Sequence, residues 1–252
     1  MISRHDLLSF LDNTLQPSKI KDYCPNGLQV EGANDIKHIV TGVTASQALI
    51  DAAILEGADT ILVHHGYFWK GENQAITSLK KNRIKSLLMA DINLIAYHLP
   101  LDIHPIIGNN AQLAQLFNIV DVEGLEFGNK QSVAVKGNLK ESQTVNELAK
   151  VIENKLGRSP LVEGDSNKVI KTVAWCSGGG QNFIEMAGEQ GIDAFITGEV
   201  SEQTIHLARE YDIAFFAAGH HATERYGAKA LGELISEKLD VSVSFIDIDN
   251  PA

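Results

Sequence analysis

Two adjacent histidines, His64 and His65, end the apolar stretch TILV and are followed at once by Gly66 and the aromatic run YFW. The stretch is typical of a buried strand, and successive side chains of a strand point to opposite faces. Two neighbouring imidazoles can therefore serve one site only if the chain changes direction there. If the strand ends at Val63 and the chain turns at Gly66, the two rings can splay apart, one toward each of two metal ions.

Three further apolar stretches end in the same kinds of side chain. The chain has nine histidines, and six of them follow such stretches: His64, His65, His98, His104, His220 and His221. The carboxylates found beside them are Asp102, Glu199 and Glu224. In open α/β sheets, ligands bind beyond the carboxyl ends of the strands, so we expect these side chains to form one site.

Neutral imidazole and carboxylate are the usual ligands of zinc, iron, manganese and similar ions. A hydrolytic two-metal site commonly uses a carboxylate that can bridge the two ions. The four-residue gap from His220 to Glu224 places both on one face of a helix that begins near His221. The sequence therefore predicts a dinuclear metal site, with more donors than one ion needs.

Other polar motifs have simpler explanations. Asp59 and Asp193 precede strands, and we expect them to stabilise turns. His104 is expected to be a loop residue, or to contact a metal-binding side chain without binding the metal itself. The segment SGGGQ (177–181) is predicted to be a tight turn, with a phosphate-holding loop as the alternative. The run YFW (67–69) could stack on a base or cover a subunit contact, and the sequence does not separate the two.

The chain repeats itself. Residues 39–66 align with residues 173–200 at one constant offset, and each reads as strand, turn, helix, Gly-x-Asp turn and strand. Upstream, LQVEG (28–32) matches PLVEG (160–164), and downstream His98 matches His220.

We therefore predict an α/β protein with two similar, duplicated halves, roughly 1–125 and 126–252. Strands this apolar are typical of a central, mostly parallel sheet that is flanked by helices. The segment 131–137 is predicted to be an extra strand near the join.

Composition limits the partners. The formal net charge of −11 weighs against a nucleic-acid partner, because such binding draws mainly on Lys and Arg, but it does not exclude one. Only Cys24 and Cys176 are present, too few for a disulfide framework or a thiolate zinc site. The first residues carry charge where a signal peptide would be apolar, and no run is long enough to span a membrane. We expect a cytoplasmic protein with a small-molecule substrate and no membrane partner.

Several blocks resemble one known family, the GTP cyclohydrolase I type 2-like proteins, also described as NGG-one interacting factor three-like. The blocks are DYCPNGLQVEG, TGVTASQALID, VHHGYFWKGE, HLPLD, GNNAQLA, FITGEVSEQTIH and AAGHHATERYG, in the family's order. The resemblance spans the whole chain. It implies two α/β halves with a dinuclear metal centre between them, and assembly as a homohexamer, a toroid with the sites facing its cavity.

Carried over residue by residue, the resemblance implies two divalent ions per chain, whose identity among Zn, Fe, Mn, Ni and Mg stays open. His64 and Asp102 would bind one ion, His65 and His220 the other, and Glu224 would bridge them. His98 would be a nearby site residue. Some relatives carry a large domain inserted in mid-chain, for which this sequence has no room.

The family name suggests that water opens the imidazole ring of GTP, followed by rearrangement to a dihydropterin triphosphate. No residue here identifies guanine, so two functions stay open. We favour a metal-dependent hydrolase of a nucleotide or related small molecule, with His98 or Glu199 as general acid or base. The alternative is a non-catalytic, metal-loaded ring that binds a protein partner or nucleic acid.

Overall fold

The structure is a computed structural model that describes residues 1–252. Its contacts divide the chain into two compact units. Unit 1 comprises residues 1–108 and 227–249, and unit 2 comprises residues 109–226 and 250–252. These units are divided differently from the two sequence repeats, whose boundary near residue 125 remains a prediction. None of the helices combines the length and apolar composition needed to cross a bilayer.

Unit 1 is built around a five-stranded sheet. Its strand order is β13-β4-β5-β6-β2, in which β13, β4, β5 and β6 run parallel and β2 is antiparallel to β6. The strands are β2 (Gly27–Val30), β4 (His38–Thr44), β5 (Thr60–His65), β6 (Asn93–Ala96) and β13 (Ser242–Phe245). The short strands β1 (Ile2–Ser3) and β3 (Asp35–Ile36) pair separately.

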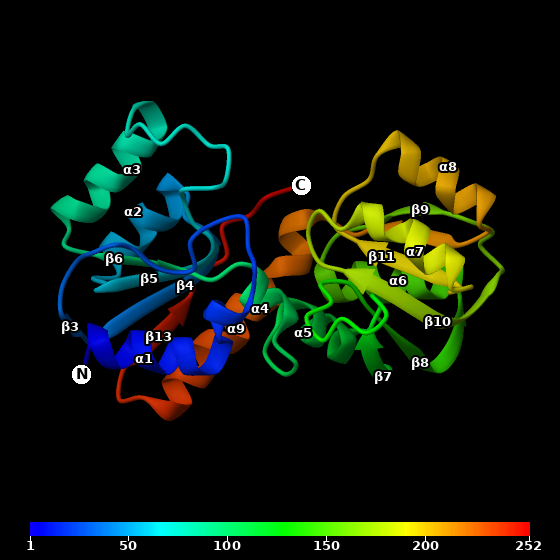
Figure 1. Ribbon diagram of the computed structural model, residues 1–252, viewed down its shortest axis with the longest axis horizontal. Coiled ribbons are helices and arrows are strands. Elements are labelled where there is room, and N and C mark those ends of the chain that lie inside the picture. The colour runs from blue at the N-terminus through cyan, green and yellow to red at the C-terminus, as the bar shows by residue number, and fades with distance from the viewer. The chain divides into compact units, whose positions relative to one another are not determined.

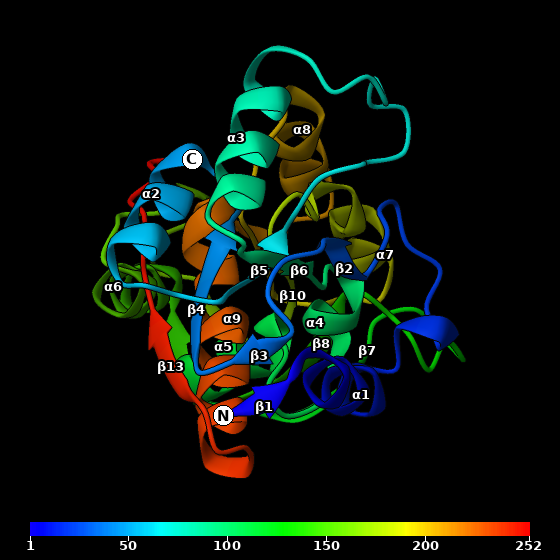
Figure 2. The same ribbon diagram turned by 90° about the vertical axis from the view of Figure 1, so that its left-hand side faces the viewer.

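Helices cover both faces of this sheet (Figures 1 and 2). The helices α2 and α3 lie over one face, and α1 and the later part of α9 lie over the other. The alternation of the strands explains the two layers, because Ile61 and Val63 pack with α2 and α3 whereas Leu62 packs with α1 and α9. The helical segments are α1 (Arg4–Leu15), η1 (Pro17–Lys19), α2 (Gln47–Leu55), α3 (Ser78–Met89) and α4 (Leu99–Ile103).

Unit 2 contains a six-stranded sheet with the order β7-β8-β10-β11-β12-β9. Its central strands β10, β11 and β12 are parallel, and β9 and β8 flank them in antiparallel pairing. The strands are β7 (Ile119–Gly124), β8 (Val135–Thr144), β9 (Leu161–Glu163), β10 (Val169–Cys176), β11 (Ala194–Thr197) and β12 (Ala214–Ala217).

Two helical layers also cover the sheet of unit 2. Leu148 and Ile152 of α6 pack on one face with Trp175, and Ile184 of α7 packs on the other with Phe215. The helical segments are α5 (Asn109–Leu116), α6 (Val145–Leu156), η2 (Gln181–Phe183), α7 (Ile184–Glu189) and α8 (Glu202–Glu210). Helix α9 (His220–Lys238) starts in unit 2 and continues into unit 1.

The sheet orders agree with the sequence repeat. The series β2-β6-β5-β4 in unit 1 has its counterpart in β9-β12-β11-β10 of unit 2, with the same strand directions. The predicted α/β class with parallel sheets is therefore confirmed. The extra strand predicted at 131–137 is β8, which starts later, at Val135, because its pairing with β10 begins there, with Val135 opposite Trp175.

Candidate metal centre

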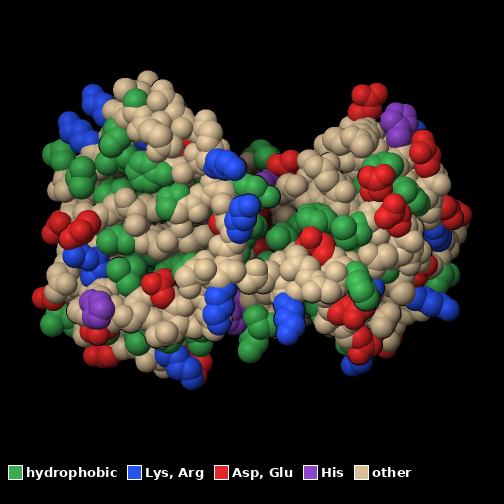
Figure 3. All heavy atoms as spheres, in the orientation of Figure 1, with side chains coloured by type: hydrophobic (Ala, Val, Ile, Leu, Met, Phe, Trp, Pro, Cys, Tyr) green, Lys and Arg blue, Asp and Glu red, His purple; other side chains and the backbone are tan.

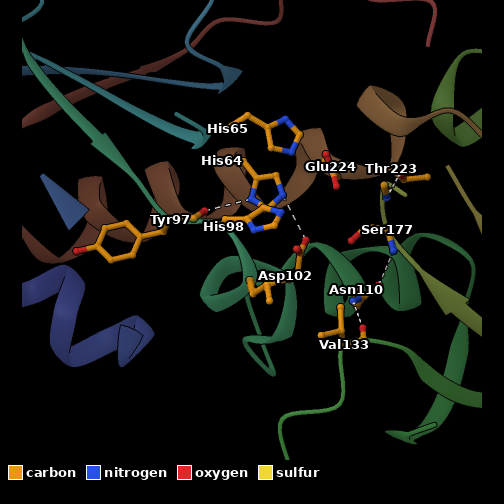
Figure 4. Close-up of polar contacts among 12 residues, drawn as sticks. His64, His65, Tyr97, His98, Asp102, Asn110, Val133, Ser177, Thr223 and Glu224 are labelled. Carbon is orange, nitrogen blue, oxygen red and sulfur yellow. Dashed lines mark hydrogen bonds and ion pairs between the residues drawn. The ribbon is translucent and has the colours of Figure 1, made fainter. Parts of the chain in front are cut away.

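His64 is the fully buried member of the histidine pair at the end of β5. Its Nδ1 lies 3.1 Å from the carbonyl oxygen of Tyr97, so this nitrogen carries the proton and donates it to the carbonyl. Its Nε2 lies 3.5 Å from Oδ1 of Asp102, a buried carboxylate on α4 (Figure 4). In the neutral ring, that nitrogen and the carboxylate are both acceptors, so a proton or a cation must lie between them. This arrangement fits a metal ligand pair.

His65 also belongs to β5, which corrects the expectation that the strand ends at Val63. The pairing with β4 continues to Thr44 and His65, and therefore holds both histidines in extended backbone. The two rings nevertheless stay close, with centroids 4.5 Å apart and planes tilted by 44°. Nδ1 of His65 lies 3.2 Å from the hydroxyl oxygen of Thr44.

His98 lies at the start of α4 and joins the same group. The nearest donor nitrogens of His64, His65 and His98 all lie within 4.8 Å of one another, so these three imidazoles could hold a metal ion. Nδ1 of His98 lies 2.8 Å from Oδ1 of Asp22, and its backbone N–H donates to Oδ1 of Asn26. Its predicted catalytic role remains a prediction.

In unit 2, His220 and Glu224 form a second donor pair. Helix α9 begins at His220, and Nε2 of that residue lies 3.0 Å from Oε2 of Glu224, one turn later. Nδ1 of His220 lies 2.7 Å from Oε1 of Glu199. Burial lowers the pKa of His220, but the hydrogen bonds and negative charge of Glu224, and then of Glu199, outweigh burial and raise the pKa to about 9. The expected one-face arrangement of His220 and Glu224 is therefore confirmed.

A glycine turn makes room for this pair. Gly178 adopts a φ of +62°, and a Cβ at this position would overlap the carboxylate of Glu224. Its amide donates to the hydroxyl of Thr223, and the amide of Ser177 donates to the side chain of Asn110 (Figure 4). The amide of Gly180 donates to the hydroxyl of Thr197. These amides already have partners inside the protein, which favours the tight-turn interpretation of SGGGQ over a phosphate-holding loop.

Glu199 follows β11, and its carboxylate contacts the ring of His220. Its second oxygen accepts a hydrogen bond from Nε2 of Gln181 at 3.3 Å. The carboxylate can only accept, so it orients the His220 ring through Nδ1. A role of Glu199 in proton transfer remains a prediction.

The simpler interpretations hold for the other motifs. Oδ2 of Asp59 accepts the backbone N–H groups of Lys37 and His38. Nδ1 of His104 accepts the N–H groups of Ile106 and Ile107, and burial lowers its pKa, so this histidine stabilises a turn.

Asp22 is a site residue to which the sequence analysis gave no role. It lies in the block DYCPNG, far from His98 in the sequence, and no spacing rule connects the two. Cys24 lies in the same block. Burial, and then the charge of Asp22, raise the pKa of the Cys24 thiol to about 12, which keeps it protonated.

The donor chemistry of each unit thus fits a divalent metal. Unit 1 supplies His64, His65 and Asp102 with His98 beside them, and unit 2 supplies His220 and Glu224. Buried carboxylates and imidazoles whose second nitrogen is held by a carbonyl or carboxylate are typical of metal sites. The thiol of Cys24 lies with Asp22 and His98 in a further group that could hold an ion, but the donors of these pairs are imidazoles and carboxylates, which favour zinc, iron, manganese or nickel over softer ions.

Several known proteins are similar to this chain over nearly its whole length. A family model described as Duf34/NIF3 (NGG1p interacting factor 3) matches residues 2–251. A protein of Pasteurella multocida (strain Pm70), named GTP cyclohydrolase 1 type 2 homolog, is 59% identical over 248 residues, 98% of each chain. A protein of Escherichia coli (strain K12) with the same name is 54% identical over 251 residues, 98% of each chain.

Solved structures share the whole fold. One, named protein ybgI and of unknown function, has a TM-score of 0.95 and 54% identity, with 100% of both chains covered. Another, from Thermus thermophilus, has a TM-score of 0.89 and 30% identity over 100% of both chains.

Proposed function

Because the chain belongs to the Duf34/NIF3 family, we propose that it is a dinuclear-metal hydrolase of a nucleotide or related small molecule. The observation that carries the proposal is the position of the His64 ring between the Tyr97 carbonyl and the Asp102 carboxylate. Its Nδ1 is committed to the Tyr97 carbonyl, and its Nε2 faces the buried carboxylate of Asp102. A buried, oriented imidazole opposite a buried carboxylate has no simple role in packing.

In the proposed centre, His64 and Asp102 would hold one ion, His65 and His220 would hold the other, and Glu224 would be shared by both. This assignment follows the family resemblance. The course of the chain supports it, because the chain passes from unit 1 to unit 2 soon after Asp102 and returns within α9, soon after Glu224. When bound, two such ions act as Lewis acids and lower the pKa of water toward neutrality.

The protein's own side chains would orient the metal ligands and accept the proton. Glu199 holds the His220 ring by its Nδ1, so that Nε2 points toward Glu224. His98 has its Nδ1 on Asp22, which leaves its Nε2 to accept a proton from water or substrate. Trp69 lies against the His98 ring, edge to face, with centroids 4.8 Å apart, and restricts its rotation.

GTP is the first substrate to test, because the relatives' shared name includes GTP cyclohydrolase. The metal-loaded protein should convert GTP to a product that becomes a fluorescent pterin after oxidation. The Glu224→Gln variant serves as the blank, and Glu233→Gln, an exposed change on the same helix, serves as the control. No product with manganese, zinc, iron or nickel would rule out GTP as the substrate.

A metabolite screen with the same three proteins then tests the wider class. Turnover of any nucleotide that requires Glu224 but not Glu233 would support a hydrolase. Stoichiometric metal without turnover of any compound would favour the non-catalytic metal-loaded ring instead. Acidic side chains over α7 and α8 weigh against nucleic acid as the ligand of that ring (Figure 3).

The assembly and location are part of the same proposal. We expect a homohexameric ring in the cytoplasm. Light scattering should give a mass near six times that of one chain, and a monodisperse monomer would contradict the ring.

A further inference from the structure

Asp22 is a buried carboxylate with an unusual number of donors around it. Its side chain is 3% exposed and lies in the loop before β2. Oδ1 accepts from Nδ1 of His98 at 2.8 Å and from the N–H of Tyr23 at 2.6 Å. Oδ2 accepts from Asn26 and from the N–H of Leu99, each at 2.9 Å. Both oxygens are therefore fully used as acceptors.

This arrangement fixes the protonation pattern of the His98 ring. A carboxylate facing three other N–H groups can only accept, so Nδ1 of His98 must carry a proton. In the neutral ring, Nε2 then holds the free lone pair. The ring is 14% exposed, and its centroid lies 5.0 Å from that of His64 and 5.8 Å from that of His65.

The repeat offers an independent comparison. His98 aligns with His220, and Nδ1 of His220 is also held by a carboxylate, at 2.7 Å from Glu199. The two carboxylates do not come from equivalent positions, because Glu199 aligns with His65 and follows a strand, whereas Asp22 precedes one. A carboxylate thus holds Nδ1 of the histidine in both units, although it comes from different positions of the repeat. This indicates that the histidine needs the carboxylate, and that the contact is not simply inherited from the duplication.

We propose that Asp22 is a positioning residue that holds His98 as the Nδ1–H tautomer and presents its Nε2 as the proton acceptor of the site. The proposal deepens the hydrolase function above and rests on it for the use of that nitrogen. The competing explanation is that Asp22 serves only to join its loop to the first turn of α4 through Asn26 and Leu99.

The first test is the tautomer itself, measured by NMR of ¹⁵N-histidine in the metal-free, full-length protein. The His98→Gln variant assigns the signals. At a pH where the ring is neutral, His98 should show a protonated Nδ1 and an unprotonated Nε2. A protonated Nε2 in the wild type would overturn the inference. This measurement needs no metal, so its outcome is independent of whether the proposed activity exists.

Asp22→Asn tests the cause. In the wild type both carboxylate oxygens of residue 22 accept hydrogen bonds. In the variant, the NH₂ group of Asn takes the place of one oxygen and must face a donor. The Nδ1–H form of His98 should therefore lose its preference. Asn26→Ala is the matched control. It removes contacts of the same loop to Asp22 and to the His98 backbone, but leaves the carboxylate on Nδ1. Asp22→Glu should restore part of the wild-type pattern.

In the metal-loaded protein with an identified substrate, Asp22→Asn should lower kcat by about 10- to 100-fold, with a smaller change in KM. Asn26→Ala should affect stability more than kcat. Equal losses of kcat in both variants, with unchanged His98 signals in Asp22→Asn, would show that Asp22 is only structural. A correct tautomer without turnover of any compound would instead defeat the hydrolase proposal and leave the assignment of the ring intact.

Discussion

Asp59 and Asp193 perform the same task, one in each unit. Oδ2 of Asp59 accepts the N–H groups of Lys37 and His38 where β4 begins, and Oδ2 of Asp193 accepts those of Lys171 and Thr172 in the early part of β10. Each aspartate thereby connects the start of the second strand of its βαβ unit to the start of the first strand by hydrogen bonds. The Gly-x-Asp turns of the repeat therefore have a structural explanation in these paired backbone contacts.

Asp193→Asn should destabilise the protein at neutral pH by about 1 kcal/mol, because a neutral amide oxygen replaces a charged acceptor at a half-buried position that solvent partly screens. Burial raises the pKa of Asp193, but hydrogen bonds from Thr172 and Lys171 outweigh burial and lower it below 3.8. The negative charge of Asp193 thus stabilises the folded state at pH values above the pKa that this residue has in the unfolded chain. This contribution is lost as pH falls through the lower, folded value.

Urea unfolding from neutral to acid pH checks this prediction. The difference between wild type and Asp193→Asn should stay constant down to roughly pH 5 and shrink below pH 4. Asp249→Asn, an exposed change of the same charge, should show little difference at any pH. A difference that grows on acidification would contradict the role given to Asp193.

Glu224→Gln should cut the metal content from about two ions per chain toward one or none, because the amide loses the charge needed for a bridging ligand. Elemental analysis after dialysis measures the content. Glu233→Gln, exposed on the same helix, should keep full loading. Undiminished metal in Glu224→Gln would refute the bridge.

Metal removal should also lower thermal stability. An ion present at about 100 times its dissociation constant stabilises the folded state by about 2.7 kcal/mol, which corresponds to several degrees in Tm for a chain of this size. Adding a chelator to the wild type should therefore lower Tm, and adding it to Glu224→Gln should change Tm much less. An equal fall in both proteins would place the stabilising ion elsewhere.

Local patterns in the sequence were sufficient for the layered fold and for most of the donors. The apolar runs and the repeat predicted the βαβ unit that contains β4 and β5, and the spacing in GHHATE predicted the His220 and Glu224 pair. Element ends were less predictable because they depend on pairing. β5 reaches His65 because Thr44 pairs with it, and β8 continues past the predicted end at residue 137 because its pairing with β10 extends to Thr144.

The Asp22 and His98 pair shows a second limit. These residues are 76 positions apart, and their contact depends on how the loop before β2 returns to the end of β6. Periodicity and spacing describe neighbours along one helix or strand, so they carry no information about such a contact. The block DYCPNG is recognised only as part of a family block, with no partner assigned to Asp22.

Trp69 should report metal binding in unit 1. Its ring lies 5.9 Å from that of His65 and 4.8 Å from that of His98, centroid to centroid. A paramagnetic ion such as Co²⁺ bound by His65 should quench its fluorescence. Trp69→Phe should lose this response and still bind the metal, while His65→Asn should lose the response because it loses the ion. Quenching that persists in Trp69→Phe would assign the signal to Trp175.

Gly178→Ala should disrupt the unit 2 donor pair without changing any donor. The residue has a φ of +62°, which an alanine adopts at a cost of about 1 kcal/mol, and the new Cβ would overlap the Glu224 carboxylate. The same Cβ would lie 3.0 Å from Nε2 of His220, so the pair cannot keep its present geometry. Metal content should therefore fall together with Tm.

Gly191→Ala separates the clash from the backbone strain. Gly191 has a φ of +68°, and a Cβ there meets nothing within 4 Å, so this variant carries the same strain without the overlap. It should lower Tm by about 2–4 °C for each kcal/mol of strain and keep its metal. Only the difference in metal content between the two variants reports on Glu224. If both variants kept full loading, the position of the Glu224 carboxylate beside Gly178 would not matter for the ion, and the bridging role would lose its structural support.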